Sequence, residues 1–364
     1  MTILQVLPAL EMGGVERGTV EVASALQEAG VRNFVASAGG RLVAGLERIG
    51  VGHFTLPAAS KNPFVLYRNA ARLAAFAREK GVTLMHVRSR APAWSVLWAS
   101  RRTGIPFLST FHGVYGVSPA FPKKQYNAVM LKGVKVIAVS DFVKRHILET
   151  YPVREEHVVR IYRGADTEVF KPAPPRASGG KPVVTLVGRL TRWKGQLLLL
   201  DALAKLARPV RCLLVGSDQG RTAYTAELNA RAATLPPCVE VEIRQEAPDM
   251  PAVYAASDVV VNASLDPEAF GRVIPEAQAC GRVAVGAAHG GACETIDDGR
   301  TGFLFKPGDA GDLAVKLAVA LDLSAASREA MCAAAAVSVR TQFSVARMCS
   351  ETLALYRRLE EQYG

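Results

Sequence analysis

Two segments of the chain repeat one order of elements: a short apolar strand, a glycine turn and a helix. The first begins with the strand at 3–7 and passes through a glycine pair, and the second begins with the strand at 183–187 and passes through Gly188. Short, almost wholly apolar runs that end in glycine turns are typical of buried parallel strands. The repeat therefore predicts an α/β fold with two Rossmann-like domains.

A Pro- and Gly-rich segment, PAPPRASGGKP, separates the two halves and is the clearest linker in the sequence. The 364 residues are enough for two domains of ordinary size. We predict a first domain at 1–172, a linker at 173–181, a second domain at 182–342 and a final helix at 343–364. Within the first domain, the apolar pattern predicts one helix over 67–79.

Composition excludes several classes of protein. Hydrophobic residues make up 49% and charged residues 21%, which argues against disorder. No apolar run approaches the ~20 residues that a membrane-spanning helix needs, and the first residues are typical of a strand rather than a signal peptide. The six cysteines form no C-x-x-C pair, which argues against zinc and against a disulfide framework. They are typical of buried thiols in a reducing cytoplasm.

The net charge of +11 requires a partner or a solvated surface. No basic motif interleaved with aromatic residues is evident, so we expect no nucleic-acid partner. Lys and Arg cluster in the first half of the chain. Two interpretations remain open, an anionic membrane surface and simple surface charge.

The stretch 262–279, NASLDPEAFGRVIPEAQA, carries the strongest chemical signal. An apolar strand leads into a tight loop with Gly271 and then into an alanine-rich helix, whose start can bind an anion. Glu268 and Glu276 bracket the loop, and their carboxylates can accept hydrogen bonds from hydroxyls. A phosphate joined to a polyol is the ligand that this stretch suggests.

Other strand ends carry polar residues, as ligand sites of open α/β sheets require. Arg189 and Lys194 follow the strand at 183–187 and would neutralise a diphosphate. His112 follows the strand at 106–110. The adjacent Gly13 and Gly14 do not fit G-x-G-x-x-G, which argues against a dinucleotide-dependent oxidoreductase.

Together these motifs resemble family 4 of the retaining GT-B glycosyltransferases. The matching segments are GG-x-E-R, T-x-H-G, V-G-R-x4-K-G and E-x7-E, and the resemblance covers nearly the whole chain. The chain is also similar to bacterial transferases of lipopolysaccharide core and cell-surface glycans. One departure is Arg163, which stands where the family usually has Asn. After the second carboxylate, Gly290 and Gly291 are predicted to mark a turn near the donor, and His289 a loop residue without chemistry.

The resemblance implies roles for individual residues. Glu268 and His112 would lie at the donor sugar, and Glu276 would bind the ribose. The predicted catalytic residues are His112, Glu268, Arg189 and Lys194. The predicted nucleotide-sugar-binding residues are Gly13, Gly14, Arg189, Lys194, Arg244, Phe270, Gly271, Arg272, Val273 and Glu276.

The resemblance further implies two domains facing a cleft, the first on the acceptor side and the second binding the nucleotide sugar, with the last helix crossing back to the first. We expect a retaining transferase that moves a sugar to a hydroxyl of a glycan or lipid-linked glycan, in the cytoplasm or at the inner face of the cell membrane. No cofactor or metal is expected, because no D-x-D motif is evident and Asp297 and Asp298 are adjacent in a loop. Two alternatives remain open: a soluble small-molecule transferase and a non-catalytic nucleotide-sugar-binding protein.

Overall fold

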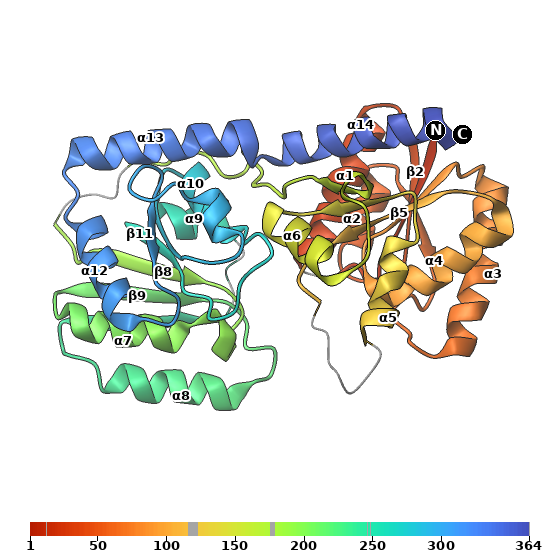
Figure 1. Cartoon of the computed structure of the whole chain (residues 1–364). Coiled ribbons are helices and arrows are strands. Elements are labelled where there is room, and N and C mark those ends of the chain that lie inside the picture. Colours follow the sequence, from red (N-terminus) through yellow and green to blue (C-terminus); the bar gives the residue numbers. More distant parts are fainter. Residues whose placement is uncertain (12, 116–122, 175–178, 246, 248, 364) are drawn as a thin grey trace. The chain divides into compact units, whose positions relative to one another are not determined.

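The computed structural model describes residues 1–364 except 12, 116–122, 175–178, 246, 248 and 364. Its internal contacts divide the chain into two compact units. Unit 1 comprises Met1–Arg163 and Ala346–Gly364, and unit 2 comprises Gly164–Val345. In each unit, helices cover a parallel sheet (Figure 1). The predicted α/β class with two Rossmann-like domains is confirmed.

The sheet of unit 1 has seven strands in the order β3-β2-β1-β4-β5-β6-β7. All pairings given for it are parallel. The strand order reverses direction between β1 and β4, so the switch point of this sheet lies there. The strands are β1 (Thr2–Val6), β2 (Arg32–Ser37), β3 (Gly52–Thr55), β4 (Leu84–Val87), β5 (Phe107–Phe111), β6 (Lys135–Ala138) and β7 (Val158–Arg160).

Two helices of unit 1, α3 and α6, begin at side-chain caps. Ser140 accepts a hydrogen bond from the Val143 backbone N–H at 3.1 Å, as predicted. Asn62 caps α3 in the same way and Pro63 is its first residue, so α3 begins four residues before the predicted start. The helices are α1 (Gly14–Glu28), α2 (Val43–Arg48), α3 (Pro63–Lys80), α4 (Arg90–Thr103), α5 (Lys123–Asn127), α6 (Asp141–Thr150) and α14 (Val345–Tyr363).

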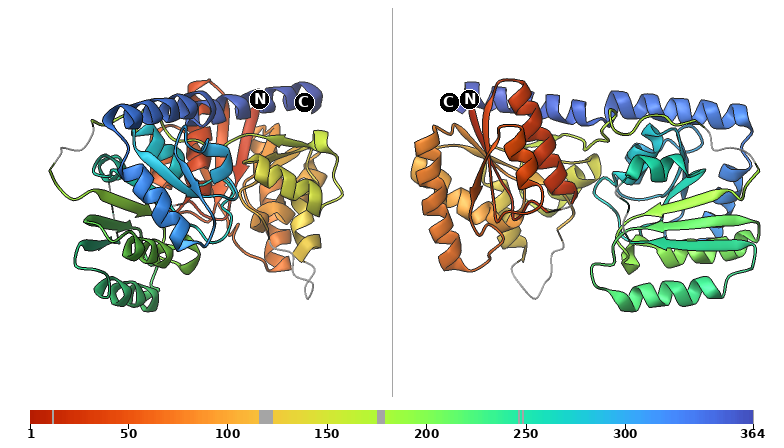
Figure 2. Two further views of the ribbon diagram at one scale, coloured as in Figure 1. Left: turned by 60° about the vertical axis from the view of Figure 1, so that its left-hand side comes forward. Right: turned by 180° about the vertical axis from the view of Figure 1, so that it is seen from behind.

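The last helix, α14, packs on unit 1, as the resemblance implied. Tyr356 is fully buried, and its hydroxyl lies 2.5 Å from Nδ1 of His86 on β4. Glu360 accepts a hydrogen bond from Thr83 at 2.7 Å and pairs with the amino terminus at 3.1 Å. Figure 2 shows the first and last parts of the chain side by side in unit 1.

Unit 2 repeats the same topology with six strands in the order β10-β9-β8-β11-β12-β13, and its neighbouring strands pair in parallel. Its switch point lies between β8 and β11. Alternate residues of β11 face opposite layers, with Val259 and Val261 in one core cluster and Val260 in another. The strands are β8 (Val183–Val187), β9 (Val210–Val215), β10 (Val239–Arg244), β11 (Val259–Asn262), β12 (Val283–Ala287) and β13 (Phe303–Phe305).

Helices cover both faces of this sheet. Apolar residues of α7, α8 and α12 fill the larger core cluster, while α9, α10 and α13 pack on the other face (Figure 1). The helices are α7 (Gln196–Leu206), α8 (Thr222–Ala233), α9 (Met250–Ala255), α10 (Val273–Ala279), α11 (Ala292–Thr295), α12 (Ala310–Leu321) and α13 (Ala325–Gln342).

The contact boundary between the units falls after Arg163, nine residues before the predicted end of the first domain at 172. The intervening segment is bound to unit 2. The Ala165 N–H donates to the Phe343 carbonyl at 2.8 Å, and the Ala173 N–H donates to the Cys280 carbonyl at 3.2 Å. Phe170 lies in a core cluster of unit 2. The predicted linker at 173–181 lies partly outside the described residues.

Candidate functional site

The candidate site of unit 2 lies at its switch point, where the carboxyl ends of β8 and β11 are neighbours. Arg189 and Lys194 follow β8, and Glu268 follows β11. Parallel strands bring these residues to one edge of the sheet although 74 residues separate Lys194 from Glu268. Sequence analysis placed all three in the site.

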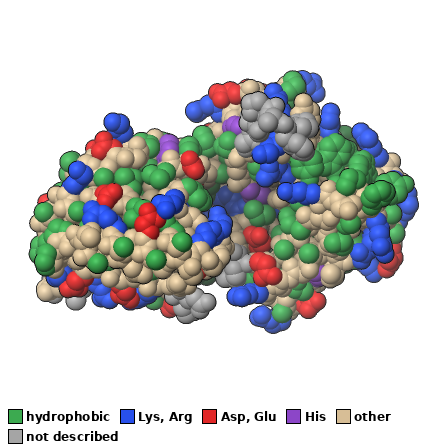
Figure 3. All heavy atoms as spheres, turned by 90° about the horizontal axis from the view of Figure 1, so that it is seen from below, with side chains coloured by type: hydrophobic (Ala, Val, Ile, Leu, Met, Phe, Trp, Pro, Cys, Tyr) green, Lys and Arg blue, Asp and Glu red, His purple; other side chains and the backbone are tan. Residues whose placement is uncertain are grey.

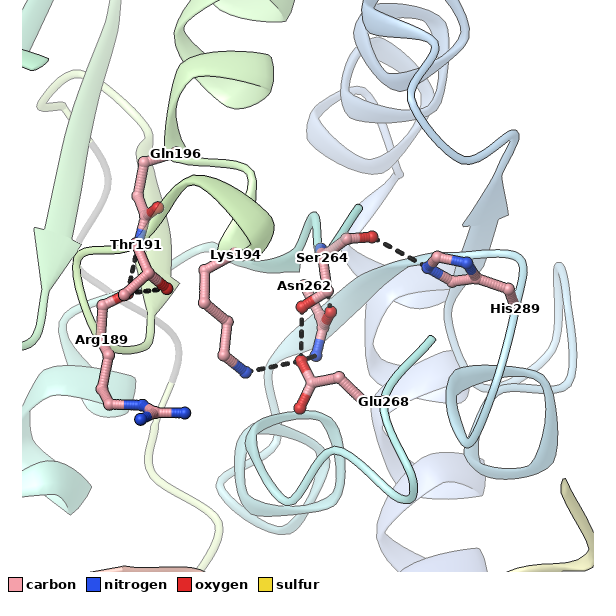
Figure 4. A network of polar contacts seen from close by, with 8 residues as sticks. All are labelled: Arg189, Thr191, Lys194, Gln196, Asn262, Ser264, Glu268 and His289. Carbon is pink, nitrogen blue, oxygen red and sulfur yellow. Dashed lines mark hydrogen bonds and ion pairs between the residues drawn. The ribbon is translucent and has the colours of Figure 1, made fainter. Parts of the chain in front are cut away.

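Glu268 is held by three donors at one oxygen (Figure 4). Its Oε1 accepts hydrogen bonds from Lys194 Nζ at 2.7 Å, Asn262 Nδ2 at 2.9 Å and Ser264 Oγ at 2.5 Å. The side chains of Lys194 and Glu268 are only 12% and 17% exposed, so solvent screens this ion pair weakly. The arrangement fixes both the position and the charge of the carboxylate.

Two opposing effects set the pKa of Glu268. Burial raises it, because a desolvated carboxylate is costly. The positive charge of Lys194 and the hydrogen bonds from Lys194, Ser264 and Asn262 lower it and together outweigh burial, so the pKa lies below its ordinary value of 4.5. The group is therefore ionised at neutral pH and serves as an acceptor.

Arg189 supplies a second positive charge beside this pair. Its guanidinium extends to the same side as the Lys194 ammonium (Figure 4). Trp193 lies between these two residues in the sequence. Its ring centroid is 4.3 Å from Lys194 Nζ and 6.0 Å from the Arg189 guanidinium carbon. Gln196, the first residue of α7, donates to the Arg189 carbonyl at 2.9 Å and holds that turn. Arg189 and Lys194 thus place two positive charges at the sheet edge, where an anion could bind.

Glu276 lies on the buried side of α10 and has partners of its own. Its Oε2 accepts a hydrogen bond from the Tyr254 hydroxyl at 2.9 Å, and its Oε1 lies 3.4 Å from Arg272 Nε. Tyr254 is fully buried. The second carboxylate of the E-x7-E pair is therefore also oriented by side-chain contacts.

Glycines pack the two loops of the site against each other. Gly290 has a φ of +58°, and a Cβ placed there would lie 2.4 Å from the Glu268 carbonyl. A Cβ on Gly291 would lie 2.4 Å from the Phe270 backbone, and its N–H donates to the Glu268 carbonyl at 2.8 Å. The turn at Gly290 and Gly291 supports the Glu268 loop directly.

In unit 1, Arg163 joins two predicted site residues. Its Nη1 donates to Nδ1 of His112 at 2.9 Å, and its Nη2 donates to the Gly14 carbonyl. Gly18 on α1 leaves room for this guanidinium, since a Cβ there would lie 2.5 Å from Nη2. The residue that departs from the family pattern thus connects the start of α1 with the end of β5.

The pKa of His112 lies well below its ordinary value of 6.5. Burial is the main cause, and the charges of Arg163 and Arg88 and the nearby His86 lower it further. The ring is therefore neutral at physiological pH. Its Nε2 is buried and has no hydrogen-bond partner among the described residues.

The contacts of two other predicted binding residues, Arg244 and Phe270, do not by themselves assign them to the site. Arg244 ends β10, pairs with Glu242 and accepts at its carbonyl from the Gly216 N–H at 2.8 Å. No described contact joins it to Lys194 or Glu268. Phe270 is 3% exposed, so its backbone rather than its ring would meet a ligand. The roles of both residues stay predictions.

Sequence reasoning did not assign roles to four residues of these groups. Asn262 and Ser264 lie within the highlighted stretch, and their Asn-x-Ser pattern just before Glu268 was an available signal. His289, predicted to be a loop residue without chemistry, donates from Nε2 to the Ser264 carbonyl at 2.8 Å (Figure 4). For Trp193, the only signal in the sequence was its position next to Lys194.

Two family models match the chain. Residues 12–169 match Glycosyltransferase Family 4, and residues 169–337 match Glycosyl transferases group 1. The two matches meet at residue 169 and together cover residues 12–337, which include most of both units.

Individual relatives agree with these matches. The D-inositol 3-phosphate glycosyltransferase of Mycolicibacterium paratuberculosis is 30% identical over 295 residues, which is 73% of this chain and 65% of that relative. A solved glycosyltransferase from Rickettsia africae is 39% identical with a TM-score of 0.90, covering 98% of both chains. Anabaena HepE in complex with UDP-glucose is 26% identical with a TM-score of 0.81, covering 97% of this chain and 99% of that one.

Proposed function

The chain belongs to glycosyltransferase family 4, with the GT-B fold, and we propose that it transfers a sugar from a nucleoside diphosphate sugar to a hydroxyl of a glycan acceptor, with retention of the anomeric configuration. The observation that carries the proposal is the Lys194–Glu268 pair at the switch point of unit 2. An ionised carboxylate and two cations at one sheet edge suit a ligand with hydroxyls and a diphosphate. The Rickettsia relative, similar over its whole length, supports the activity.

The cations would act on the leaving group. As the bond between the sugar C1 and the phosphate oxygen breaks, negative charge develops on the departing diphosphate. Lys194 and Arg189 would stabilise that charge, and donors fixed in advance at such a position are worth about 2.7–4 kcal/mol each. Because these two side chains would stabilise the leaving group, the proposed reaction requires no metal ion. Anabaena HepE is similar to this chain and was solved with UDP-glucose, which makes a UDP-sugar the first donor to test.

Glu268 would act on the sugar. Three donors hold its Oε1, so the carboxylate is placed as a fixed negative charge and hydrogen-bond acceptor rather than as a nucleophile. The acceptor hydroxyl would attack C1 from the face that the diphosphate leaves. The new bond joins C1 to the acceptor oxygen, and the hydroxyl proton passes to the departing phosphate oxygen. Glu268 would stabilise the positive charge that develops on the ring meanwhile.

The acceptor that we propose is a glycan carried on a lipid, such as a lipopolysaccharide precursor, met in the cytoplasm at the inner face of the membrane. The charge of +11 favours an anionic acceptor or surface. A second candidate acceptor is a small phosphorylated polyol, because the M. paratuberculosis relative bears the name of a D-inositol 3-phosphate glycosyltransferase. The chain spans only 65% of that relative.

Thermal stabilisation by nucleotides tests the donor site. UDP, GDP, ADP and their sugar conjugates are added to the protein first without EDTA and then with it. At ligand near 100 Kd the expected stabilisation is about 2.7 kcal/mol, enough to shift the melting temperature visibly. A shift with one base that persists in EDTA supports a metal-independent donor site, and loss of that shift in EDTA would refute metal independence. No shift with any nucleotide would refute the donor site itself.

Product analysis tests the reaction. The nucleotide that stabilises the protein is supplied as its sugar conjugate, with either a lipid-linked glycan or a phosphorylated inositol. Transfer with the α configuration kept, read by NMR of the product, supports retention. An inverted product would overturn that part of the proposal, and binding without transfer to any hydroxyl would favour a non-catalytic sugar-binding protein.

A further inference from the structure

We propose that unit 1 carries a docking surface for an anionic lipid bilayer, formed by aromatic side chains of α3, α4 and α5. This surface rests on the proposed function, since a lipid-linked acceptor would be met there. Its residues lie outside those assigned to catalysis. We call it the aromatic strip. Its members are Phe64, Tyr67, Trp98, Trp94 and Tyr126.

Ring contacts connect four members of the strip. The Tyr67 and Trp98 centroids lie 6.4 Å apart, those of Trp98 and Trp94 5.8 Å, and those of Trp94 and Tyr126 6.3 Å. Phe64 precedes Tyr67 by three residues on α3, so both lie on one face of that helix. The contacts join three helices that are separate in the sequence.

One end of the strip is exposed to water. Phe64 is 87% exposed and Tyr67 is 62% exposed, while the opposite face of α3, with Leu66 and Leu73, is buried. An exposed phenyl ring loses the free energy that burial of its apolar surface would give. Tyr and Trp are the side chains that favour the boundary between lipid and water, because each combines an apolar ring with a polar group.

Basic side chains accompany the strip. The Arg102 guanidinium carbon lies 4.3 Å from the Tyr67 ring centroid. The others lie beside the aromatic residues in the sequence or one helical turn away, and all five are exposed. They are Lys61, Arg68, Arg101, Lys123 and Lys124. Figure 3 shows a field of hydrophobic side chains with Lys and Arg side chains beside it.

The positive charge of the whole chain comes from this part of the sequence. Residues 48–140 contain 14 Lys and Arg and a single acidic residue, Glu79. Their net charge of +13 exceeds the +11 of the entire chain, so the remaining residues are slightly acidic overall. The exposed basic residues beside the strip belong to this segment. Anionic lipids attract such residues, and exposed aromatic rings distinguish the surface from a merely charged one. No helix in the described part of the chain is long and apolar enough to cross a membrane.

Vesicle partitioning of the full chain tests the proposal. The protein is sedimented with vesicles of phosphatidylcholine alone or mixed with phosphatidylglycerol, at about 0.1 M and about 1 M salt, where the screening lengths are ~10 Å and ~3 Å. We expect at least tenfold stronger partitioning onto the anionic vesicles at low salt, since each basic residue near the surface contributes a factor of roughly five. A part of the binding should persist at high salt.

Variants separate the two components. Phe64→Ser with Tyr67→Ser should remove the salt-resistant part, and Arg101→Glu with Lys123→Glu and Lys124→Glu should weaken low-salt binding at least tenfold. Val315→Ser with Val319→Ser, two exposed valines of α12, is the control for the apolar change. Arg300→Glu with Lys306→Glu, both in unit 2, is the control for charge. Both controls should bind as the unaltered protein does.

Tryptophan fluorescence gives an independent readout. The chain has three tryptophans, and Trp193→Phe leaves only the two of the strip. Their emission should shift to shorter wavelength with anionic vesicles. Absence of anionic-vesicle binding, or equal binding by the strip variants, would overturn the proposal. The proposal would also be overturned if high salt abolished binding entirely and the Phe64→Ser, Tyr67→Ser variant bound as the unaltered protein does. Nucleotide binding is measured separately, so failure of the donor site leaves this test unaffected.

Discussion

Nη1 of Arg163 lies 2.9 Å from Nδ1 of His112. A guanidinium can only donate, so Nδ1 is the acceptor and the neutral ring carries its proton on Nε2. That N–H is buried and has no hydrogen-bond partner among the described residues. Arg163 therefore fixes which nitrogen of His112 can act, and it does so from the position where the family usually has Asn.

Replacing Arg163 with Asn should make activity sensitive to acid. Burial and the Arg163 charge both lower the pKa of His112, and the substitution relieves both, so this pKa should rise toward 6.5. Below the raised pKa the ring becomes a cation, which would oppose the positive charge proposed to develop on the sugar. We expect kcat/KM of the variant to fall in acid at a higher pH than that of the unaltered enzyme, whose His112 pKa is held well below 6.5.

Arg163→Lys is the matched control, because it keeps the charge and a donor. Its pH profile should stay close to that of the unaltered enzyme. Nitrogen NMR of the histidine reports the tautomer directly. A proton found on Nδ1, or identical pH profiles for the Asn and Lys variants, would rule out the positioning role.

Lys194→Ala should reduce kcat/KM by roughly 10²–10³-fold, because the leaving diphosphate loses one fixed positive charge. Arg192→Ala is the control, because Arg192 and Lys194 lie in one 3₁₀ helix (Arg192–Lys194). Arg192 is also a cation but pairs with Glu227 at the surface. Steady-state kinetics with a nucleotide sugar compares the two, and equal losses would show a general charge effect.

Glu268→Gln should lower stability by about 1–3 kcal/mol at neutral pH, since it removes the charged acceptor of three hydrogen bonds. The pKa of Glu268 is depressed, so its contribution is present above 4.5 and is lost as pH falls through the folded-state value. The difference in unfolding free energy between variant and parent should therefore shrink below pH 4.5. Denaturant melts across pH measure it, with Glu329→Gln, an exposed site on α13, as control. A difference that grows in acid would contradict the assignment.

Glu276→Gln should weaken binding of the nucleoside diphosphate by about 1.5–3 kcal/mol if the carboxylate binds the ribose. Tyr254→Phe keeps the carboxylate but removes the hydrogen bond that orients it, so its loss should be smaller, about 0.5–1.5 kcal/mol. Calorimetry measures both. Unchanged affinity in Glu276→Gln would exclude the ribose role.

Gly290→Ala should impair turnover far more than Gly299→Ala. Both glycines have positive φ, +58° and +79°, so both substitutions strain the backbone by about 1–2 kcal/mol. Only at Gly290 would the new Cβ meet the Glu268 backbone, whereas nothing lies within 4 Å at Gly299. Melting temperatures and kcat of the two variants separate strain from displacement of the Glu268 loop. Equal activities would show that the contact is dispensable.

Much of this arrangement could be predicted because local patterns determine it. Apolar strands followed by glycines predicted the two sheets. The position of Lys194 and Glu268 after strands predicted that both belong to the site. The three-residue strand β13 was not predicted, because it exists only through its pairing with β12. The early start of α3 was missed although Asn62 and Pro63 are ordinary start signals.

Contacts between distant residues could not be predicted. His112 and Arg163 are 51 residues apart, and no local pattern states that one side chain reaches the other. The sequence marked Arg163 only as a departure from the family. The hydrogen bonds of Asn262 and Ser264 to one oxygen of Glu268 likewise depend on the shape of the loop rather than on residue types.

The packing of α14 on unit 1 has a consequence for synthesis of the protein. Unit 2 is one continuous segment, whereas unit 1 is built from both ends of the chain. On the ribosome, unit 2 can complete its fold while His86 still lacks Tyr356 and Thr83 still lacks Glu360. Unit 1 therefore lacks these contacts until the 19-residue helix α14 has been made, and truncation within α14 would remove them from unit 1 while the sheet of unit 2 keeps all its strands.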